Sequence, residues 1–310
     1  MAGEAHGFDD HEFWDQRIQE LDEFGMFVEI DDIWDYFKFC LQTKNRFFFE
    51  NPLISSIIEQ FQEDNHAYIL PKGNMLYRAR IDEKKEYENQ CWRAKSYINL
   101  QKTDPNSFFA SSYKKLKDKI ADDPSFKDFL IRNGQGFEGF DAQGSGAPPY
   151  NKTSAGRCNP ENTVFLYAAN DIHTVTAEVR PFIRDAVSIA TLSAKRDLKL
   201  VDFYYEYSDR GLREVDNLLF DKMRIEFSSL NKGNKEEYLT TQYLSLLAQH
   251  LGFDGIRFRS SLVEQGENYV IFDADDCEVI SSKMYIIKKV EYNLLPILTE
   301  EEKEVLHEHV

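Results

Sequence analysis

Three side chains that could do chemistry lie close together in the segment SAGRCNPENTVFLYAANDIHTVTAEVRP, residues 154–181. Arg157 precedes a short apolar run, Tyr167 lies inside it, and Glu178 follows it in a segment with the composition of a helix start. A guanidinium group presents planar donors to anions, an aromatic ring offers a flat wall, and a carboxylate can face a positive charge. Their position beside an apolar run raises the question of a ligand site.

Two further arginines lie in the segment MLYRARI, residues 75–81, which alternates like a strand. The alternation places Arg78 and Arg80 on one face and the apolar residues on the other. Two arginines on one face require anions or water as partners. Taken alone, this pattern is also typical of a solvated strand face.

The carboxylate and the ring have structural alternatives as well. Glu178 could pair with Arg180 or Arg184 on a helix surface. Tyr167 could be a core aromatic residue with one hydrogen-bonded hydroxyl group.

Hydroxyl and amide groups are available further along the chain, at Ser260, Ser261 and Asn268. Such groups can bind a ribose or a carboxamide. Alternatively, the two serines only end a strand and the asparagine only forms a turn.

The candidate residues are spread over alternating predicted strands and helices. Residues 133–156 are so rich in Gly, Pro and Ser that we expect a long loop there. Strand patterns cover residues 75–81, 163–169, 186–194, 199–203, 255–261, 268–273 and 285–293, and helical patterns cover residues 211–229 and 237–251. Residues 10–66 have helical spacing, with Trp14, Ile18 and Leu21 on one face of a first helix and Pro52 at the start of a third.

These patterns predict an α+β protein with a mixed sheet. We expect a small helical domain at residues 1–72, a strand-rich domain at residues 73–295, and a tail helix at residues 296–310. The tail helix rests on Thr299 and Glu302, which have the spacing of a capping box.

Composition excludes several classes of function. The formal net charge of −17 disfavours direct binding to nucleic acid or to an anionic membrane, since both require a basic surface. The four cysteines lie far apart without metal-ligand spacing, so we expect reduced thiols and no metal. No apolar run reaches the roughly 18 residues of a membrane helix, and the acidic N-terminus does not resemble a signal peptide, so we expect a cytoplasmic protein.

Seven short blocks together resemble one known family, the RES domain, named for its arginine, glutamate and serine. Their order and spacing make the resemblance specific, and it covers about residues 75–275. The blocks are YRAR (77–80), GSGAPP (144–149), AGRCNP (155–160), LYAA (166–169), TAEVRP (176–181), TQYLSLLAQHLGFDGIRFRSS (241–261) and GENYVIF (266–272).

The resemblance implies a fold similar to the ADP-ribosyltransferase toxins and an enzyme that cleaves the nicotinamide–ribose bond of NAD as a glycohydrolase or phosphorylase. It implies NAD as the substrate, with no further cofactor, and a growth-arresting toxin or defence effector as the biological role. An Xre-type antitoxin is the implied partner, and a homo-oligomer is compatible with the insert at residues 82–132. The N-terminal helices resemble a HEPN-like accessory domain, although residues 1–74 lack the Arg-x(4–6)-His motif of HEPN ribonucleases.

The resemblance also implies roles for single residues. Glu178, Arg157 and Ser261 would be catalytic, with Glu178 stabilising the sugar cation in a site shielded from water. The substrate would be bound by Arg78, Arg80, Tyr167, Ser260 and Asn268, the arginines by contact with the diphosphate. Cys158 departs from the family pattern, where an aromatic or apolar residue is expected at that position.

Two other functions compete with NAD cleavage. An ADP-ribosyltransferase would use the same pocket but would need an open channel for a macromolecular acceptor. A non-catalytic module would bind NAD or dock a partner without consuming the nucleotide. The presence of a carboxylate beside the arginines, the tyrosine and the serines favours an enzyme.

Overall fold

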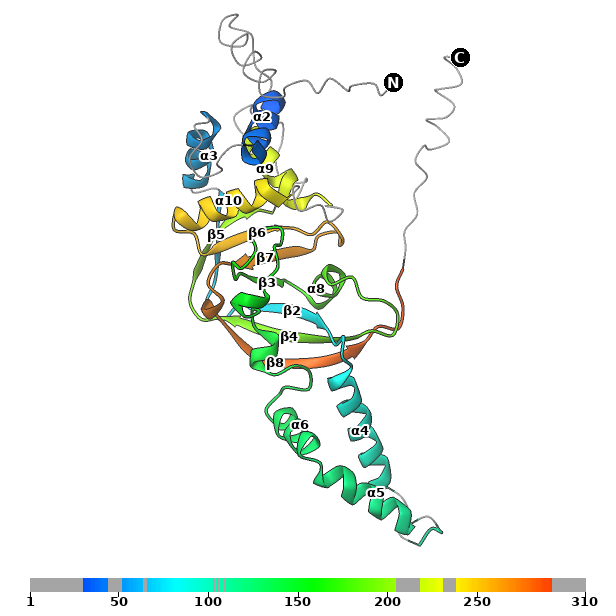
Figure 1. Ribbon diagram of the computed structural model, residues 1–310. Helices are drawn as coiled ribbons and strands as arrows, with labels where there is room; N and C mark the ends of the chain where they lie inside the picture. Colours follow the sequence, from blue (N-terminus) through cyan, green and yellow to red (C-terminus); the bar gives the residue numbers. More distant parts are fainter. Residues whose placement is uncertain are drawn as a thin grey trace, which may run out of the picture.

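The computed structural model of this protein describes residues 30–43, 52–63, 66–102, 104, 106–108, 110–204, 218–230 and 238–291. Within these residues the chain forms one eight-stranded sheet with helices packed around it (Figure 1). The predicted helix that contains Trp14 and the predicted tail helix at residues 296–310 lie outside the described residues, and so does the beginning of the predicted helix at 211–229.

The sheet is mixed, as the sequence predicts. Its strands lie in the order β1-β5-β6-β7-β3-β2-β4-β8, and every neighbouring pair is antiparallel except β5 and β6. The α+β class is therefore confirmed. The strands are β1 Ala67–Leu70, β2 Met75–Ile81, β3 Leu166–Ala169, β4 Ala186–Ala194, β5 Leu198–Phe203, β6 Gly255–Arg259, β7 Glu267–Ile271 and β8 Cys277–Ile286.

The sheet has a seam between β3 and β2. In the described chain these two strands share a single paired position, Tyr77 with Ala169, whereas four residues of β3 pair with β7 and seven of β2 pair with β4. The ladder is thus weakest in the middle of the sheet. Helix α8, Ile172–Glu178, packs against strands from both sides of this seam (Figure 1).

Helices α9 and α10 occupy the connection between the two parallel strands β5 and β6. A parallel pair requires such a crossover, because a tight turn cannot return the chain in the same direction. Helices α2 and α3 pack on this crossover, and their apolar residues share one core with it. The helices are α2 Ile30–Thr43, α3 Pro52–Gln62, α9 Leu218–Ser228 and α10 Leu239–His250, and the fully buried aromatic residues of this core include Phe37, Phe61, Phe203, Phe220 and Phe227.

The domain division at residue 72 stays a prediction, but two observations bear on it. Residues 67–70 form β1, which pairs with β5, so the sheet begins inside the segment that was expected to be helical. The buried side chains of α2 and α3 also belong to the core beneath the sheet. These two helices are therefore not packed independently of the strand-rich part.

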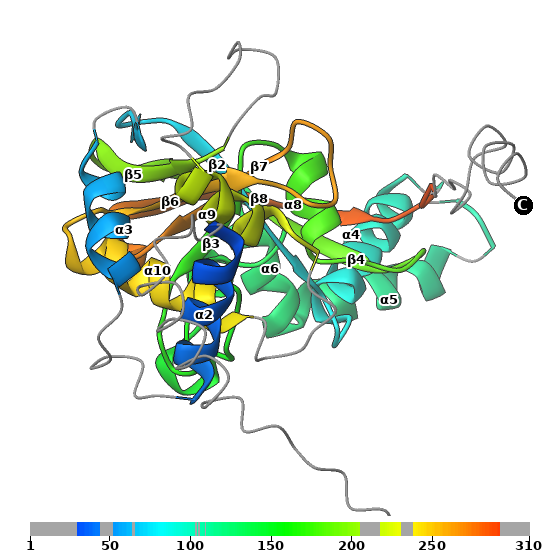
Figure 2. The same cartoon turned by 90° about the horizontal axis from the view of Figure 1, so that it is seen from above.

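Three helices form an arm that projects away from the sheet at the β8 edge, opposite to α2 and α3 (Figures 1 and 2). They are α4 Glu86–Gln101, α5 Ala110–Asp122 and α6 Pro124–Gly134. The arm has a small core of its own around Phe126 and Phe129. Helix α6 begins where the Asp123 side chain accepts hydrogen bonds from the backbone of Ser125 and Phe126, which is the geometry of a strong N-cap.

Two expectations about local structure are wrong. The segment 133–156 is not only loop, because the Asp141 side chain accepts a hydrogen bond from Gly144 N and caps the short helix α7, Ala142–Ser145; a single 3-10 turn follows at Tyr150–Lys152. The strand expected at residues 285–293 is the end of a longer strand, β8, that begins at Cys277 and ends at Ile286; only Ile287 continues the pairing, through backbone hydrogen bonds with Arg184 and Asp185.

Candidate active site

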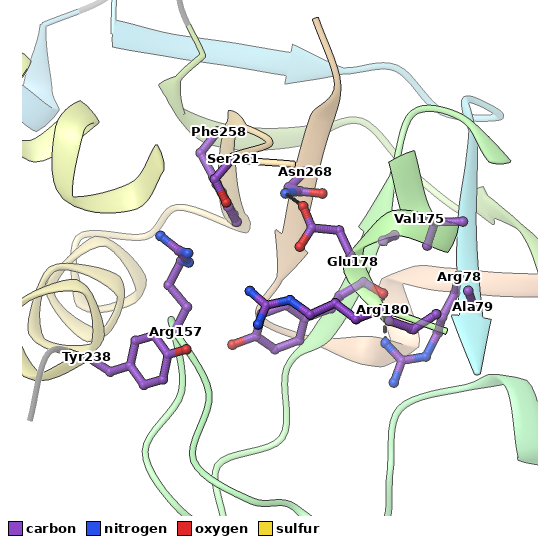
Figure 3. A pocket seen from close by; sticks show the side chains of 13 residues that line it. Arg78, Ala79, Arg157, Val175, Glu178, Arg180, Tyr238, Phe258, Ser261 and Asn268 are labelled. Atoms are coloured by element: carbon purple, nitrogen blue, oxygen red, sulfur yellow. Dashed lines mark hydrogen bonds between the residues drawn. The ribbon is translucent and has the colours of Figure 1, made fainter. Parts of the chain in front are cut away.

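A pocket of 560 Å³ lies at the seam of the sheet. Strands β2, β3, β6 and β7 contribute to its walls, and the C-terminal end of α8 lies over it. Figure 3 shows Arg157, Arg180, Glu178 and Ser261 around the same hollow. Its volume is within the range typical of small-molecule sites, about 300–1,000 Å³.

Glu178 is the last residue of α8, and its carboxylate is held on one side only. Ser260 Oγ and Asn268 Nδ2 each donate a hydrogen bond of 2.7 Å to Glu178 Oε1. Among the described residues, Oε2 accepts no hydrogen bond and the carboxylate forms no ion pair with Arg180 or Arg184. The alternative that Glu178 pairs with an arginine on the helix surface is therefore wrong. The hydrogen bonds to Oε1 orient the carboxylate, and Oε2 is available to a ligand.

Helix α8 is fixed at its start, which places Glu178 at its end. The Asp171 side chain accepts hydrogen bonds from His173 N and Thr174 N, and Thr174 Oγ1 donates to the same carboxylate. Gly266 lies against Thr174 so closely that a Cβ there would come within 2.7 Å of the threonine hydroxyl. Asp171 is therefore the N-cap residue of α8.

Arg78 is a largely buried cation without a carboxylate partner in the described chain. Its Nη1 donates to the Tyr167 carbonyl oxygen at 2.7 Å, while its buried Nε has no hydrogen-bond partner. Burial lowers the pKa of Arg78 to about 10, and the nearby charge of Arg80 adds to this effect. A buried charge that a carbonyl only partly satisfies is costly, which is typical of a group reserved for a ligand.

Arg157 is anchored by backbone and not by acidic side chains. Its Nη1 donates to the carbonyl oxygens of Glu226 and Phe227 at the end of α9, at 3.2 and 2.6 Å. Its guanidinium carbon lies 6.0 Å from the centre of the Phe258 ring. A cation at the negative end of a helix is favourable, and the remaining guanidinium donors are free to bind an anion.

The loop that carries Arg157 is held rigidly. Asn159 donates to three carbonyl oxygens of the loop, and its Oδ1 accepts a 2.6 Å hydrogen bond from the Tyr167 hydroxyl. Gln242 Nε2 donates to the carbonyls of Gly156 and Asn159, which ties the loop to α10. A Cβ at Gly156 would lie 2.6 Å from Asn159 Oδ1 and 2.9 Å from the Tyr167 hydroxyl, so the glycine permits this packing.

Tyr167 therefore combines both roles that the sequence allowed. The residue lines the pocket, and its hydroxyl is fixed by Asn159 and by the backbone N–H of Cys158. Burial raises the pKa of Tyr167 well above its ordinary value, so the hydroxyl stays protonated at neutral pH.

Cys158 is a core residue and not a nucleophile. The side chain is fully buried in the main apolar core, which explains how a cysteine fits where the family pattern expects an apolar residue. Burial raises the pKa of the Cys158 thiol to about 12, so the reactive thiolate is absent at neutral pH.

The electrostatics of the pocket differ from those of the whole chain. The chain carries a net charge of −17, yet the pocket is lined by three arginines, Arg78, Arg157 and Arg180, and by one carboxylate. In the described part of the chain none of the three arginines forms an ion pair. The pocket is therefore a local cationic site suited to an anionic ligand.

The structure brings most of the predicted residues together. Arg78, Arg157, Tyr167, Ser261 and Asn268 line the pocket with Glu178. Ser260 stands behind the carboxylate and holds it. The serine that contacts Glu178 is thus Ser260, predicted as a substrate-binding residue, and not Ser261, predicted as catalytic.

Two expectations about the site are wrong. Arg80 does not line this pocket: its Nη2 donates to the Gly146 carbonyl, and the residue lines a neighbouring depression that shares Ala79 and Val179 with the pocket. The expected shielding from water is also absent, because Glu178 is an exposed residue in an open pocket.

Sequence reasoning missed several pocket residues. Arg180 and Tyr238 line the cavity, and neither was assigned a role there. Asn159 and Gln242 shape the loop of Arg157. The signal for the last two was available, since both lie inside the sequence blocks AGRCNP and TQYLSLLAQ.

The described residues contain neither a metal-binding cluster nor a membrane-spanning helix. No group of three or more His, Cys, Asp or Glu residues is arranged to hold a metal ion within the described chain. Each helix in that part is too short or too polar to span a lipid bilayer.

Comparison with known proteins identifies one family. The family model of the RES domain matches residues 132–293. No curated protein matches the sequence. Among solved structures, the crystal structure of the M. tuberculosis MbcT–MbcA toxin–antitoxin complex aligns with a TM-score of 0.35 and 11% sequence identity, over 74% of this chain and 92% of that chain.

Proposed function

Because the chain belongs to the RES domain family, we propose that it is an NAD-consuming enzyme that cleaves the bond between nicotinamide and ribose. One observation carries this proposal. Glu178, with one oxygen fixed by Ser260 and Asn268 and the other free, shares a pocket with arginines that have no carboxylate partner in the described chain. A dinucleotide with an anionic diphosphate and a ribose that becomes positive when its base departs needs both features.

The chemistry follows from the charges of NAD. When the C1′–N bond breaks, both bonding electrons move to the pyridinium nitrogen, so nicotinamide leaves as a neutral molecule and no general acid is required. The ribose becomes an oxocarbenium-like cation, which a fixed carboxylate stabilises. Glu178 Oε2 is the group available for this role. Water then bonds to C1′ and loses a proton, which gives ADP-ribose; phosphate in place of water would give the phosphorylated sugar.

Ser260 and Asn268 act as positioning residues. Their hydrogen bonds hold Glu178 Oε1 from β6 and β7, so that the carboxylate need not reorganise when the sugar becomes positive. Arg78 and Arg157 supply the cationic side of the pocket for the diphosphate, and Tyr167 supplies an aromatic wall for a base.

Purified protein incubated with NAD tests the proposal by the release of free nicotinamide. Parallel reactions with and without inorganic phosphate distinguish hydrolysis from phosphorolysis through the sugar product. The proposal predicts nicotinamide in at least one of the two reactions. An absence of nicotinamide in both would overturn it.

ADP-ribose transfer to a macromolecule is the second candidate, and the openness of the pocket favours it. Glu178 is exposed, so an acceptor group could approach the sugar. NAD labelled in the adenylate half separates the two functions. Transfer would place the label on a macromolecule, whereas hydrolysis would leave it in free ADP-ribose.

A toxin or defence role would follow from depletion of NAD, and such an enzyme needs restraint in the cell that makes it. We infer an Xre-type antitoxin as the restraining partner. Expression of this chain alone should arrest growth, and expression together with a neighbouring small helix-turn-helix protein should relieve the arrest. Growth arrest by the inactive Glu178→Gln variant would contradict this role for NAD cleavage.

A further inference from the structure

Arg180 has an unfavourable backbone conformation directly beside the pocket. It follows the C-terminal cap of α8, Val179, and its φ angle is +47°. At this position after a helix the left-handed conformation is common, but glycine is the residue that adopts it without a steric penalty. Strained conformations of this kind gather at functional sites. The presence of an arginine where glycine would be less strained suggests a role for the arginine side chain.

The side chain of Arg180 differs from the other two pocket arginines in its contacts. Arg78 donates to the Tyr167 carbonyl, and Arg157 donates to two carbonyls at the end of α9. Arg180 lines the same pocket, yet its guanidinium has no hydrogen bond or ion pair with any residue that the structure describes. Figure 3 shows it extended across the pocket between Glu178 and Arg157. Two arginines are therefore fixed, and the third is free to move.

We propose that Arg180 determines specificity for a diphosphate-containing nucleotide by closing over the bound diphosphate, an inference that rests on the proposed function for the identity of the ligand. The fixed arginines set where the anion lies, and the free one completes its coordination with planar, paired donors. Because Glu178 is exposed, the same movement would cover the carboxylate after the substrate has entered. Water is thereby excluded only in the complex.

The chain provides a matched control for this proposal. Arg184 also has a left-handed backbone, with a φ angle of +78°, and it lies in the same loop after α8. Its side chain does not line the pocket. Replacement of either arginine by glycine relieves the same backbone penalty, but only the change at Arg180 removes a pocket cation.

Binding of ADP-ribose to the full chain, measured by calorimetry, tests the proposal without requiring catalysis. Arg180→Gly should weaken binding by about tenfold or more, the loss typical of one charged hydrogen-bonding group, without a lower melting temperature. Arg184→Gly should bind within about twofold of the unaltered chain. Arg180→Lys should fall between them, because lysine keeps the charge but not the paired donors.

A second ligand, AMP, tests whether Arg180 recognises the diphosphate and not a single phosphate. The loss caused by Arg180→Gly should be smaller for AMP, which has one phosphate, than for ADP-ribose. Equal ADP-ribose affinity in Arg180→Gly and the unaltered chain, an equal loss in Arg184→Gly, or no binding to the unaltered chain would each overturn the inference. If the unaltered chain binds ADP-ribose through Arg180 but releases no nicotinamide from NAD, the inference stands and the proposed reaction fails.

Discussion

Two regions of the same protein hold arginines in opposite ways. Outside the pocket, Arg257 Nε forms an ion pair of 2.8 Å with Glu267, and its Nη1 lies 3.3 Å from Asp202. Its guanidinium carbon also lies 4.3 and 4.5 Å from the ring centres of Tyr68 and Tyr204. The charge of Arg257 is thus neutralised and enclosed within the protein.

The pocket shows the other arrangement. Arg78 and Arg157 donate to backbone carbonyls, and the nearby Glu178 is bound by the neutral side chains of Ser260 and Asn268. The positive charges of the two arginines and the negative charge of Glu178 therefore do not neutralise one another. The difference separates a structural arginine, whose partners are carboxylates, from arginines whose charge remains available to a ligand.

The largest expected effect is the loss of turnover in Glu178→Gln. Glutamine keeps the shape of the side chain but not the negative charge, so turnover of NAD should fall by about three orders of magnitude while the melting temperature changes little. Nicotinamide release and thermal unfolding measured on the same preparation check both parts. A folded variant with a near-normal rate would remove Glu178 from the mechanism.

Arg257→Met should have the opposite effect: a loss of stability without a loss of NAD binding. Removal of the arginine leaves Asp202 and Glu267 without their cation, and the free energy of unfolding should fall by about 3 kcal/mol with an unchanged KM for NAD. Arg196→Met is the control, because Arg196 pairs with Asp254 and Asp276 with its side chain half exposed. That change should cost less than about 1 kcal/mol. A raised KM in Arg257→Met would contradict the distinction between this structural arginine and the pocket arginines.

The two adjacent serines, Ser260 and Ser261, should differ in their effects on turnover and on KM. Ser260→Ala removes one of the two donors to Glu178 Oε1, so turnover should fall by about tenfold. Ser261→Ala leaves those donors in place and should act mainly on KM. Steady-state kinetics of both variants give kcat and KM and so test these two predictions. A larger loss of turnover in Ser261→Ala than in Ser260→Ala would contradict the role of Ser260 in orienting the carboxylate.

The smallest expected effect is on the pH dependence of binding. The pKa of Arg78 lies at about 10 in the folded protein, below its ordinary value of 12.5. As pH rises through 10 the guanidinium loses its charge, so the affinity for ADP-ribose should fall, by about twofold at pH 10. The penalty that the buried charge imposes on folding is present below pH 10 and is relieved above it. Arg78→Met should lack this step in a titration of binding against pH.

The sequence allowed much of the fold to be predicted, for a physical reason. Apolar and polar residues alternate in β2, and β4 is an uncharged run that is buried on both faces; both strands have their predicted bounds. Gly252 follows the end of α10 with a φ angle of +87°. Strand β1 was missed because four residues carry too little periodicity, and β8 was misplaced because it is an edge strand in which only Cys277 and Ser282 are buried.

The site was predictable in its members but not in its details. Arg78 and Arg80 alternate onto one face of β2, yet only Arg78 lines the pocket, where it donates to the Tyr167 carbonyl; Arg80, two residues further along the strand, donates to the Gly146 carbonyl. Arg180 lies two residues after Glu178, a spacing that puts side chains on different sides of a helix. Only the left-handed turn at Arg180 returns its side chain to the pocket.

The central claim is that the free oxygen of Glu178 faces the ribose that loses nicotinamide. A crystal structure of Glu178→Gln with intact NAD tests it most directly. We predict the nicotinamide-bearing C1′ atom at about 3–3.5 Å from the side chain of residue 178, with the diphosphate against Arg78 and Arg157. NAD bound with that ribose turned away from residue 178, or bound outside this pocket, would contradict the claim.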